Sequence, residues 1–328
     1  MTNPWHSQLL ALNAEISETH HIVFKSTHTE KSGNAVYPLT QVSILQVSGL
    51  DAATFLQGQV TCNIHDITET QAGFGAFCNA KGRVLSSFIV LRNAKNFLII
   101  LPAELITPIR HHLQKYILRA DVKLTDCATE LCITGLQVHS LAHSLALPEG
   151  HLQCLTRDSL TLIRLEGKAT RYIAIADTSH TTTFWSELTQ HQFMPHDTSD
   201  WELLDIYDGI PWLSPQTSGE YTPQMLNLDK LGGISFNKGC YTGQEIVART
   251  HYLGQAKRAM FIAQTELNQS PPPNAAIIDT ANGQIVGSIL CASVQLHLAT
   301  LLVILSVSID QPKNLVIDNQ EHTPLTIL

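Results

Sequence analysis

The chain has 328 residues, which is enough for two or three domains and a sizeable hydrophobic core. Hydrophobic residues make up 44% of it and charged residues 15%, a composition that is typical of globular proteins and excludes an intrinsically disordered chain. The net charge of −8 excludes a wholly basic, nucleic-acid-binding surface.

The cysteine pattern indicates a reducing compartment. Seven cysteines are present, an odd number without a C-x-x-C pair, so we expect no structural zinc site and no other metal centre. The first residues contain no basic segment followed by an apolar one, so we expect no signal peptide and a cytoplasmic location.

Strands and helices are predicted in mixed order along the first two hundred residues. The predicted helices are 9–16, 52–59, 103–118 and 181–191. The predicted strands are 20–25, 42–47, 72–78, 84–91, 97–101, 122–125, 130–138, 160–166 and 172–176, with a hairpin turn at 79–82. This order predicts an α+β fold without a doubly wound parallel sheet. No Gly-rich dinucleotide or P-loop pattern follows a strand, which argues against those cofactors.

A capping-box pattern, Ser199-Asp-Trp-Glu202, predicts a helix that runs through Asp208. Trp201 and Asp208 then share one helix face with Leu204. One interpretation is a core helix whose indole packs inside the protein. The other is a face that binds a flat heterocycle such as a pterin, because an indole stacks on the ring and a carboxylate accepts paired hydrogen bonds from its edge.

The loop that follows, residues 215–229, is rich in Pro, Ser, Gly and Thr. Gln224 lies within it, either as a ligand contact or as a solvated loop residue.

The stretch Lys238-Gly-Cys-Tyr-Thr-Gly-Gln-Glu245 gathers a thiol, an ammonium, a phenol, an amide and a carboxylate. Thr242 and Glu245 have capping-box spacing, which predicts a helix from Gly243 that ends before Gly254. Cys240 would then precede free backbone N–H groups and lie near Lys238, and both features favour the reactive thiolate. The alternative is that Cys240 is a small buried core residue.

Residues 285–309 contain no Asp, Glu, Lys or Arg, so by length and charge they are a membrane-span candidate. The alternation of Val294, Leu296 and Leu298 with other side chains favours two β-strands instead. Short strands are predicted at 259–264, 276–279, 285–290, 294–298, 301–307, 315–317 and 325–328. Several short strands with little helix predict a small closed β-barrel.

The motif from Leu231 to Arg249 resembles the signature of YgfZ-type folate-binding proteins, which are relatives of the glycine-cleavage T-protein. This resemblance implies a mixed-sheet folate-binding region at residues 1–255, with subdomains at about 1–128 with 193–255 and at 129–192. It implies a C-terminal barrel at 256–328.

The resemblance also implies site residues. Cys240, Lys238 and Tyr241 are the expected catalytic group. The expected folate-binding residues are Trp201, Asp208, Gln224, Gln244, Glu245 and Asn63. Asn63 stands where the T-protein pattern has an Asp, and an amide cannot act as a general base, so T-protein aminomethyl transfer is not expected.

The implied cofactor is tetrahydrofolate or a one-carbon derivative. The implied role is folate-dependent support of the assembly or repair of iron–sulfur enzymes, including enzymes that thiolate tRNA, with a reactive cysteine beside the folate. Those enzymes are the expected partners, direct nucleic-acid contact stays open, and no membrane partner is expected. Two alternatives remain: a folate-dependent one-carbon transferase or demethylase, and a non-catalytic folate-gated scaffold.

Overall fold

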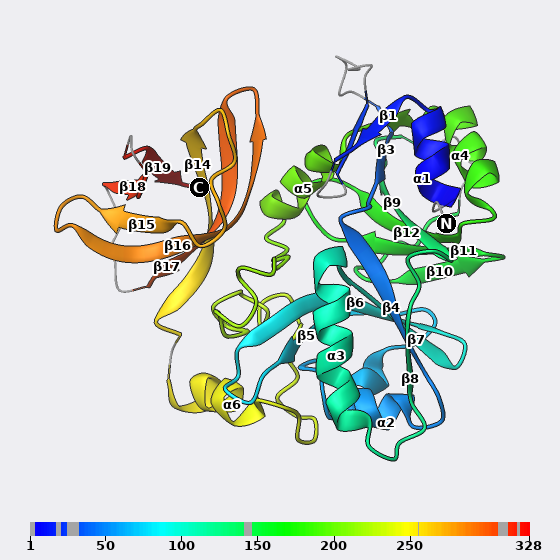
Figure 1. Ribbon diagram of the computed structural model, residues 1–328, viewed down its shortest axis with the longest axis horizontal. Coiled ribbons are helices and arrows are strands. Elements are labelled where there is room, and N and C mark those ends of the chain that lie inside the picture. Colours follow the sequence, from blue (N-terminus) through cyan, green and yellow to red (C-terminus); the bar gives the residue numbers. More distant parts are fainter. Residues whose placement is uncertain are drawn as a thin grey trace. The chain divides into compact units, whose positions relative to one another are not determined.

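The computed structural model describes residues 4–17, 21–24, 33–140, 146–254, 256–307, 314–319 and 322–328. The chain divides into two compact units. The first contains residues 1–55, 65–73 and 89–204, and the second contains residues 56–64, 74–88 and 205–328. Figure 1 labels the elements in chain order.

A six-stranded sheet in the order β10-β11-β12-β9-β3-β13 lies in the first unit. Its strands are β3 (Ala35–Pro38), β9 (Leu131–Gln137), β10 (Cys154–Arg157), β11 (Leu160–Leu165), β12 (Arg171–Asp177) and β13 (Met194–Pro195). Neighbours pair antiparallel except β13 with β3. One core joins this sheet to α1 (Pro4–Ala11) and α4 (Thr181–Gln190), with Trp5 and Trp185 in ring contact at 5.6 Å.

The N-terminal segment differs from its prediction. Residues 9–16 were expected to form a helix, but the chain turns after α1 and forms β1 (Ala14–Ile16), which pairs with β2 (Ile22–Phe24). Asn13 has a φ of 62°, which ends the helical path before β1. His20 and Lys25, the ends of the predicted strand, lie outside the described residues.

A five-stranded sheet has the order β5-β6-β7-β4-β8. It consists of β4 (Val42–Ser48), β5 (Gly73–Cys78), β6 (Val84–Asn93), β7 (Asn96–Pro102) and β8 (Lys123–Asp126). The helical elements of this part are α2 (Ala52–Gln57), the 3-10 turns η1 (Ile64–Asp66) and η2 (Ala103–Leu105), and α3 (Ile106–Ile117). Buried residues recur along α3 at positions 106, 109, 113 and 117, the spacing of one helix face.

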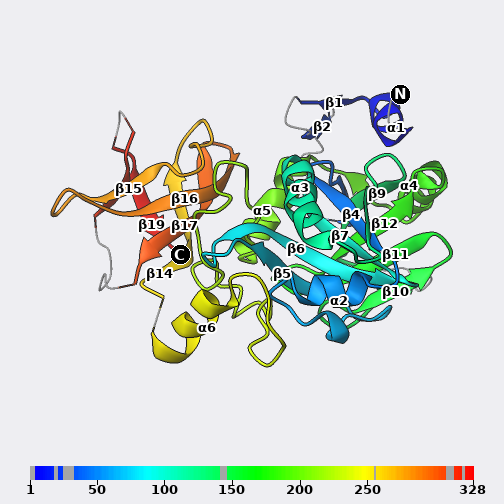
Figure 2. The same ribbon diagram turned by 60° about the horizontal axis from the view of Figure 1, so that its bottom comes forward.

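The C-terminal strands close into a six-stranded barrel with the order β14-β17-β16-β15-β18-β19, seen from two directions in Figures 1 and 2. They are β14 (Arg258–Glu266), β15 (Ala276–Asp279), β16 (Gln284–Gln295), β17 (Leu298–Ser306), β18 (Leu315–Ile317) and β19 (Pro324–Ile327). The α+β fold with a C-terminal barrel is therefore confirmed. No described helix is long and apolar enough to cross a membrane.

The uncharged stretch at 285–309 contains the hairpin β16–β17. Its turn consists of Leu296 and His297, whose φ angles are 47° and 69°. Two consecutive positive φ angles indicate a type I′ turn, which is normally built from Asn and Gly. The prediction of β-strands in this stretch is confirmed, but the predicted strand at 294–298 is wrong, because Leu296 and His297 form the turn between β16 and β17. The turn was not predicted because neither residue is typical of it.

Candidate functional site

The motif leads into helix α6 (Gln244–Leu253), so the predicted helix start and its end before Gly254 are confirmed. The predicted capping box is wrong. The N-cap is Gly243, which has a φ of 83° and no side-chain cap hydrogen bond. The Thr242 hydroxyl instead donates to Gln59 Oε1 at 3.3 Å, and Gln244 Oε1 accepts from the Tyr241 N–H at 3.3 Å. The helix therefore begins at a glycine in the left-handed conformation and not at a side chain that caps it. Glycine adopts this conformation without steric cost.

Gly243 also has to be glycine for a second reason. A Cβ at this position would lie 2.5 Å from the Asn79 carbonyl oxygen and 2.9 Å from the Gly82 Cα. Gly82 itself has a φ of 66°, and a Cβ there would lie 2.9 Å from the Ile246 Cβ. The hairpin turn predicted at 79–82 thus packs directly against the first turn of α6.

Lys238 holds the motif to an earlier segment of the chain. Its Nζ donates to the carbonyl oxygens of Val60 at 2.7 Å and Cys62 at 2.8 Å, and it lies 5.0 Å from the centre of the Tyr241 ring. Burial lowers the pKa of Lys238 to about 8, and the nearby Cys62 sulfur opposes this shift. These contacts give Lys238 a structural role that its position in the motif does not predict.

Tyr241 is buried beneath this ammonium, with 7% of its surface exposed. Burial raises the pKa of its phenol well above the usual range, and the nearby Cys78 adds to the shift. The Tyr241 phenol is therefore protonated at neutral pH and cannot act as a general base.

Cys240 differs from the other cysteines in exposure. Its side chain is exposed, Cys291 is intermediate, and the remaining five are buried. The alternative that Cys240 is a buried core residue is therefore wrong. Burial raises the pKa of Cys78 to about 12, which keeps that thiol neutral.

The expected folate-binding residues of the second unit have different surroundings. Asn63 Oδ1 accepts from Gln57 Nε2 at 2.8 Å, and Glu245 is exposed. Gln224 is only 7% exposed, and its Nε2 donates to the Val247 carbonyl oxygen at 2.7 Å, so it is not a solvated loop residue. Its Oε1 is buried and has no hydrogen-bond partner among the described residues. Helix α5 (Thr198–Tyr207) already includes Ser199, the predicted N-cap, and ends before Asp208, so both predicted ends of this helix are wrong by a residue or two. Asp208 is half-buried.

The prediction that Trp201 binds folate needs a correction. It is 2% exposed, the Arg171 guanidinium lies 4.5 Å from its ring centre, and the Tyr37 ring lies at 5.4 Å. A Cβ on Gly135 would come within 2.4 Å of the indole. The ring is thus enclosed by the first unit and has no free face for a pterin. The core-helix interpretation is the correct one for this side chain.

Some residues with chemical interest were not predicted. Asp205 is 3% exposed and its carboxylate accepts from Trp212 Nε1 at 2.8 Å. Its position four residues after the buried Trp201 was an available signal, because residues i and i+4 share a helix face. Next to the motif, Phe236 and His251 stack with ring centres 3.7 Å apart.

Comparison with known proteins gives a close relative. The chain is 38% identical over 237 residues to a protein of Colwellia psychrerythraea named tRNA-modifying protein YgfZ, a match that covers 70% of this chain and 72% of the relative. The chain belongs to the YgfZ family. Residues 13–139 also match the family model described as the GCVT N-terminal domain.

The fold of this YgfZ-family chain matches a solved structure over almost its full length. The crystal structure of the glycine cleavage system aminomethyltransferase T from Bartonella henselae aligns with a TM-score of 0.79. The match covers 99% of this chain and 95% of that one at 12% identity, so it shows a shared fold. Among the described residues of this YgfZ-family member, no cluster of three or more His, Cys, Asp or Glu is placed to hold a metal ion.

Proposed function

We propose that this protein binds tetrahydrofolate or a one-carbon derivative in the cytoplasm and uses Cys240 to support iron–sulfur enzymes that thiolate tRNA. The similarity to a relative named as a tRNA-modifying protein supports the tRNA part of this proposal. The T-protein-like fold supports the folate part.

The exposure of Cys240 is the observation that carries the proposal. Five of the seven thiols are buried, whereas the Cys240 thiol is exposed. Lys238 fixes the segment on one side through two carbonyl groups, and Gly243 fixes it on the other against the 79–82 turn. An exposed sulfur between two anchored positions suits a group that must meet a ligand or a partner protein.

One hydrogen-bond acceptor in the second unit supports a site for tetrahydrofolate. The edge of a reduced pterin carries N–H donors, which need acceptors in a protein. Gln224 Oε1 is a buried acceptor without a partner among the described residues, and such groups normally have one. We assign Gln224 and Asp208 to hold this edge. Gln244 and Glu245, at the start of α6, are assigned to the remainder of the ligand. Bound tetrahydrofolate would supply a carrier for one-carbon groups.

The residues themselves argue against T-protein chemistry. Asn63 cannot accept a proton as a carboxylate would, and its amide is oriented by Gln57. Lys238 and Tyr241 are engaged in packing and hydrogen bonds, which also favours the second candidate, a folate-gated scaffold in which Cys240 only contacts a partner. A modified folate product, detected after incubation with the protein, would favour a one-carbon transferase or demethylase over that scaffold.

Calorimetric titration with tetrahydrofolate tests the proposal. We expect saturable binding by the natural chain and about tenfold weaker binding by Gln224→Met, because one hydrogen bond to a buried partner is lost. Gln216→Met, at an exposed position of the same unit, is the matched control and should bind normally. An absence of binding by the natural chain would refute the folate proposal, and an unchanged affinity in Gln224→Met would remove Gln224 from the site.

A further inference from the structure

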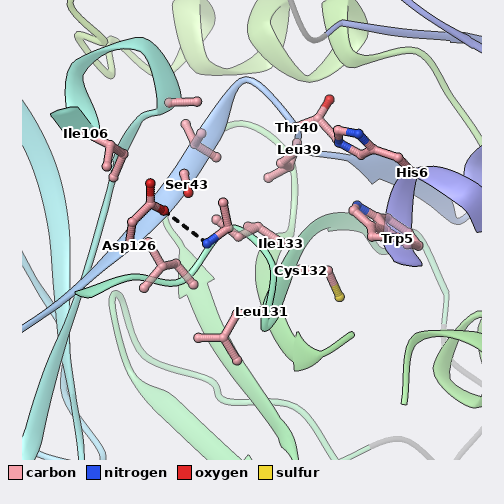
Figure 3. A pocket seen from close by; sticks show the side chains of 14 residues that line it. Trp5, His6, Leu39, Thr40, Ser43, Ile106, Asp126, Leu131, Cys132 and Ile133 are labelled. Atoms are coloured by element: carbon pink, nitrogen blue, oxygen red, sulfur yellow. Dashed lines mark hydrogen bonds between the residues drawn. The ribbon is translucent and has the colours of Figure 1, made fainter. Parts of the chain in front are cut away.

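A cavity of about 220 Å³ lies within the first unit, and Figure 3 shows the side chains that line it. Its walls come from α1, from the connection into β4, from the start of α3 and from the beginning of β9. All of these elements belong to the first unit, whereas Cys240 and the residues assigned to folate belong to the second. The volume is below the roughly 300–1,000 Å³ of pockets for drug-sized ligands, so a whole folate does not suit it.

Ser43 carries a hydroxyl in this cavity that the protein leaves without a partner. The residue is 9% exposed, and its Oγ is buried and has no hydrogen bond to any of the described residues. A buried hydroxyl in this state is destabilising and is rare in native structures. A molecule from solution that hydrogen-bonds to Ser43 would remove that cost.

Asp126 adds a negative charge to the same wall. One carboxylate oxygen, Oδ1, accepts from the Ala128 N–H at 3.1 Å, the contact drawn as a dashed line in Figure 3. The other oxygen, Oδ2, has no hydrogen bond among the described residues. The hydrogen bond to the backbone holds the carboxylate in place, so Oδ2 is a preoriented acceptor for a ligand.

Strand register explains why these two groups face the same space. Asp126 of β8 pairs with Leu45 of β4, and Ser43 lies two residues from Leu45 on that strand. Side chains two residues apart on a strand point to the same face of a sheet. Ser43 and Asp126 are therefore diagonal neighbours across two hydrogen-bonded strands, a spacing that one small polar group can bridge.

The rest of the lining is mixed: the polar side chains of His6 and Thr40 stand beside apolar ones. Leu39, Ile106, Leu131 and Ile133 supply hydrocarbon surface, and none of the described lining residues is Lys or Arg. An anion would meet the Asp126 carboxylate, and the His6 imidazole is the only basic side chain among the described lining residues. A ligand with a protonated amine and a compact apolar body would satisfy the carboxylate, the hydroxyl and the apolar wall together.

We propose that this cavity is a binding site for a small primary amine, with Asp126 and Ser43 holding the ammonium group and the apolar wall holding the body. The amine belongs either to a free metabolite or to the lysine side chain of a partner. Both sources present the same ammonium group.

Binding measurements on the full chain test this proposal. The probes are 2-phenylethylamine, its neutral counterpart 2-phenylethanol, and a short capped peptide with one lysine, each titrated calorimetrically or by NMR. We expect saturable binding of the amine with a dissociation constant of about 1 mM or lower, and at least about tenfold weaker binding of the alcohol. Binding of the peptide as well would assign a lysine side chain, and its absence would assign a free amine.

Two variants separate binding from folding. Asp126→Asn keeps an acceptor for the Ala128 N–H but loses the charge, and we expect it to weaken amine binding about tenfold or more without affecting the alcohol. Asp229→Asn, at an exposed site, is the control and should bind the amine normally. Ser43→Ala should weaken amine binding while the free protein loses no stability. No saturable amine binding at millimolar concentration, or equal binding of amine and alcohol, would overturn the proposal. Full amine binding by Asp126→Asn would overturn it too.

Discussion

Replacing Lys238 with Met tests how the motif is held in place. The substitution keeps the length of the side chain but removes both hydrogen bonds to the carbonyl groups of Val60 and Cys62. A hydrogen bond from a charged group contributes about 1.5–3 kcal/mol to stability. Because the half-buried ammonium is already partly desolvated, we take the low end for each bond. The desolvation that lowers the pKa of Lys238 offsets part of this contribution, so the free energy of unfolding should fall by about 1–2 kcal/mol at pH 7.

The pH dependence of this difference has a definite sign. The pKa of Lys238 is about 8 in the folded protein and has an ordinary value of 10.5. Between these values the unfolded chain binds more protons than the folded one, so stability rises with pH in that window. The difference in free energy of unfolding between the natural chain and Lys238→Met should therefore increase above pH 8 and stay constant below it.

Urea unfolding followed by tryptophan fluorescence measures this free energy. Lys230→Met is the matched control, because Lys230 is an exposed lysine of the same unit, and it should change stability by less than about 0.5 kcal/mol. If Lys238→Met were as stable as this control, the two hydrogen bonds would contribute nothing, and our account of the motif's support would be refuted.

Three further substitutions test single features of the fold. Trp201→Ala should lower stability by about 3–5 kcal/mol in calorimetry, because it empties a fully buried site, and full stability with weaker folate binding would restore the pterin-stacking interpretation. Gly243→Ala should lower the melting temperature, since its Cβ would lie 2.5 Å from a backbone oxygen, whereas Gly239→Ala, with open space around it, should not. Leu296→Asn should raise the free energy of unfolding by about 0.5–1 kcal/mol, because Asn tolerates the positive φ of the turn, and a loss of stability would contradict the type I′ assignment.

The sequence predicted those parts of the fold whose signals are local. Strands β4 to β7, helix α3 and the barrel strands other than β16 were predicted to within a few residues, because their apolar patterns are regular and turn residues separate most of them. Strand β3 was missed because all four of its residues are buried, so no alternation marks it. Its partner β9 lies almost one hundred residues further along the chain, and that pairing leaves no local signal.

The candidate site shows the same limit. The sequence located the start of α6 and singled out Cys240 because the motif is compact. The carbonyl groups that hold Lys238 come from positions 176 and 178 residues earlier, which no reading of the motif could supply. The family resemblance assigned Trp201 to folate, because its helix position alone is compatible with both core packing and ligand stacking. Only the packing of Arg171 and Gly135 against the indole separates them.

Replacement of Cys240 by Ser tests the central claim most directly. In a strain that lacks the corresponding gene, the natural chain and Cys291→Ser should restore thiolated tRNA, whereas Cys240→Ser should not, although it still binds tetrahydrofolate. Mass spectrometry of tRNA nucleosides measures the first property and calorimetry the second. Full restoration by Cys240→Ser would contradict the account, because the exposed thiol would then have no part in the function.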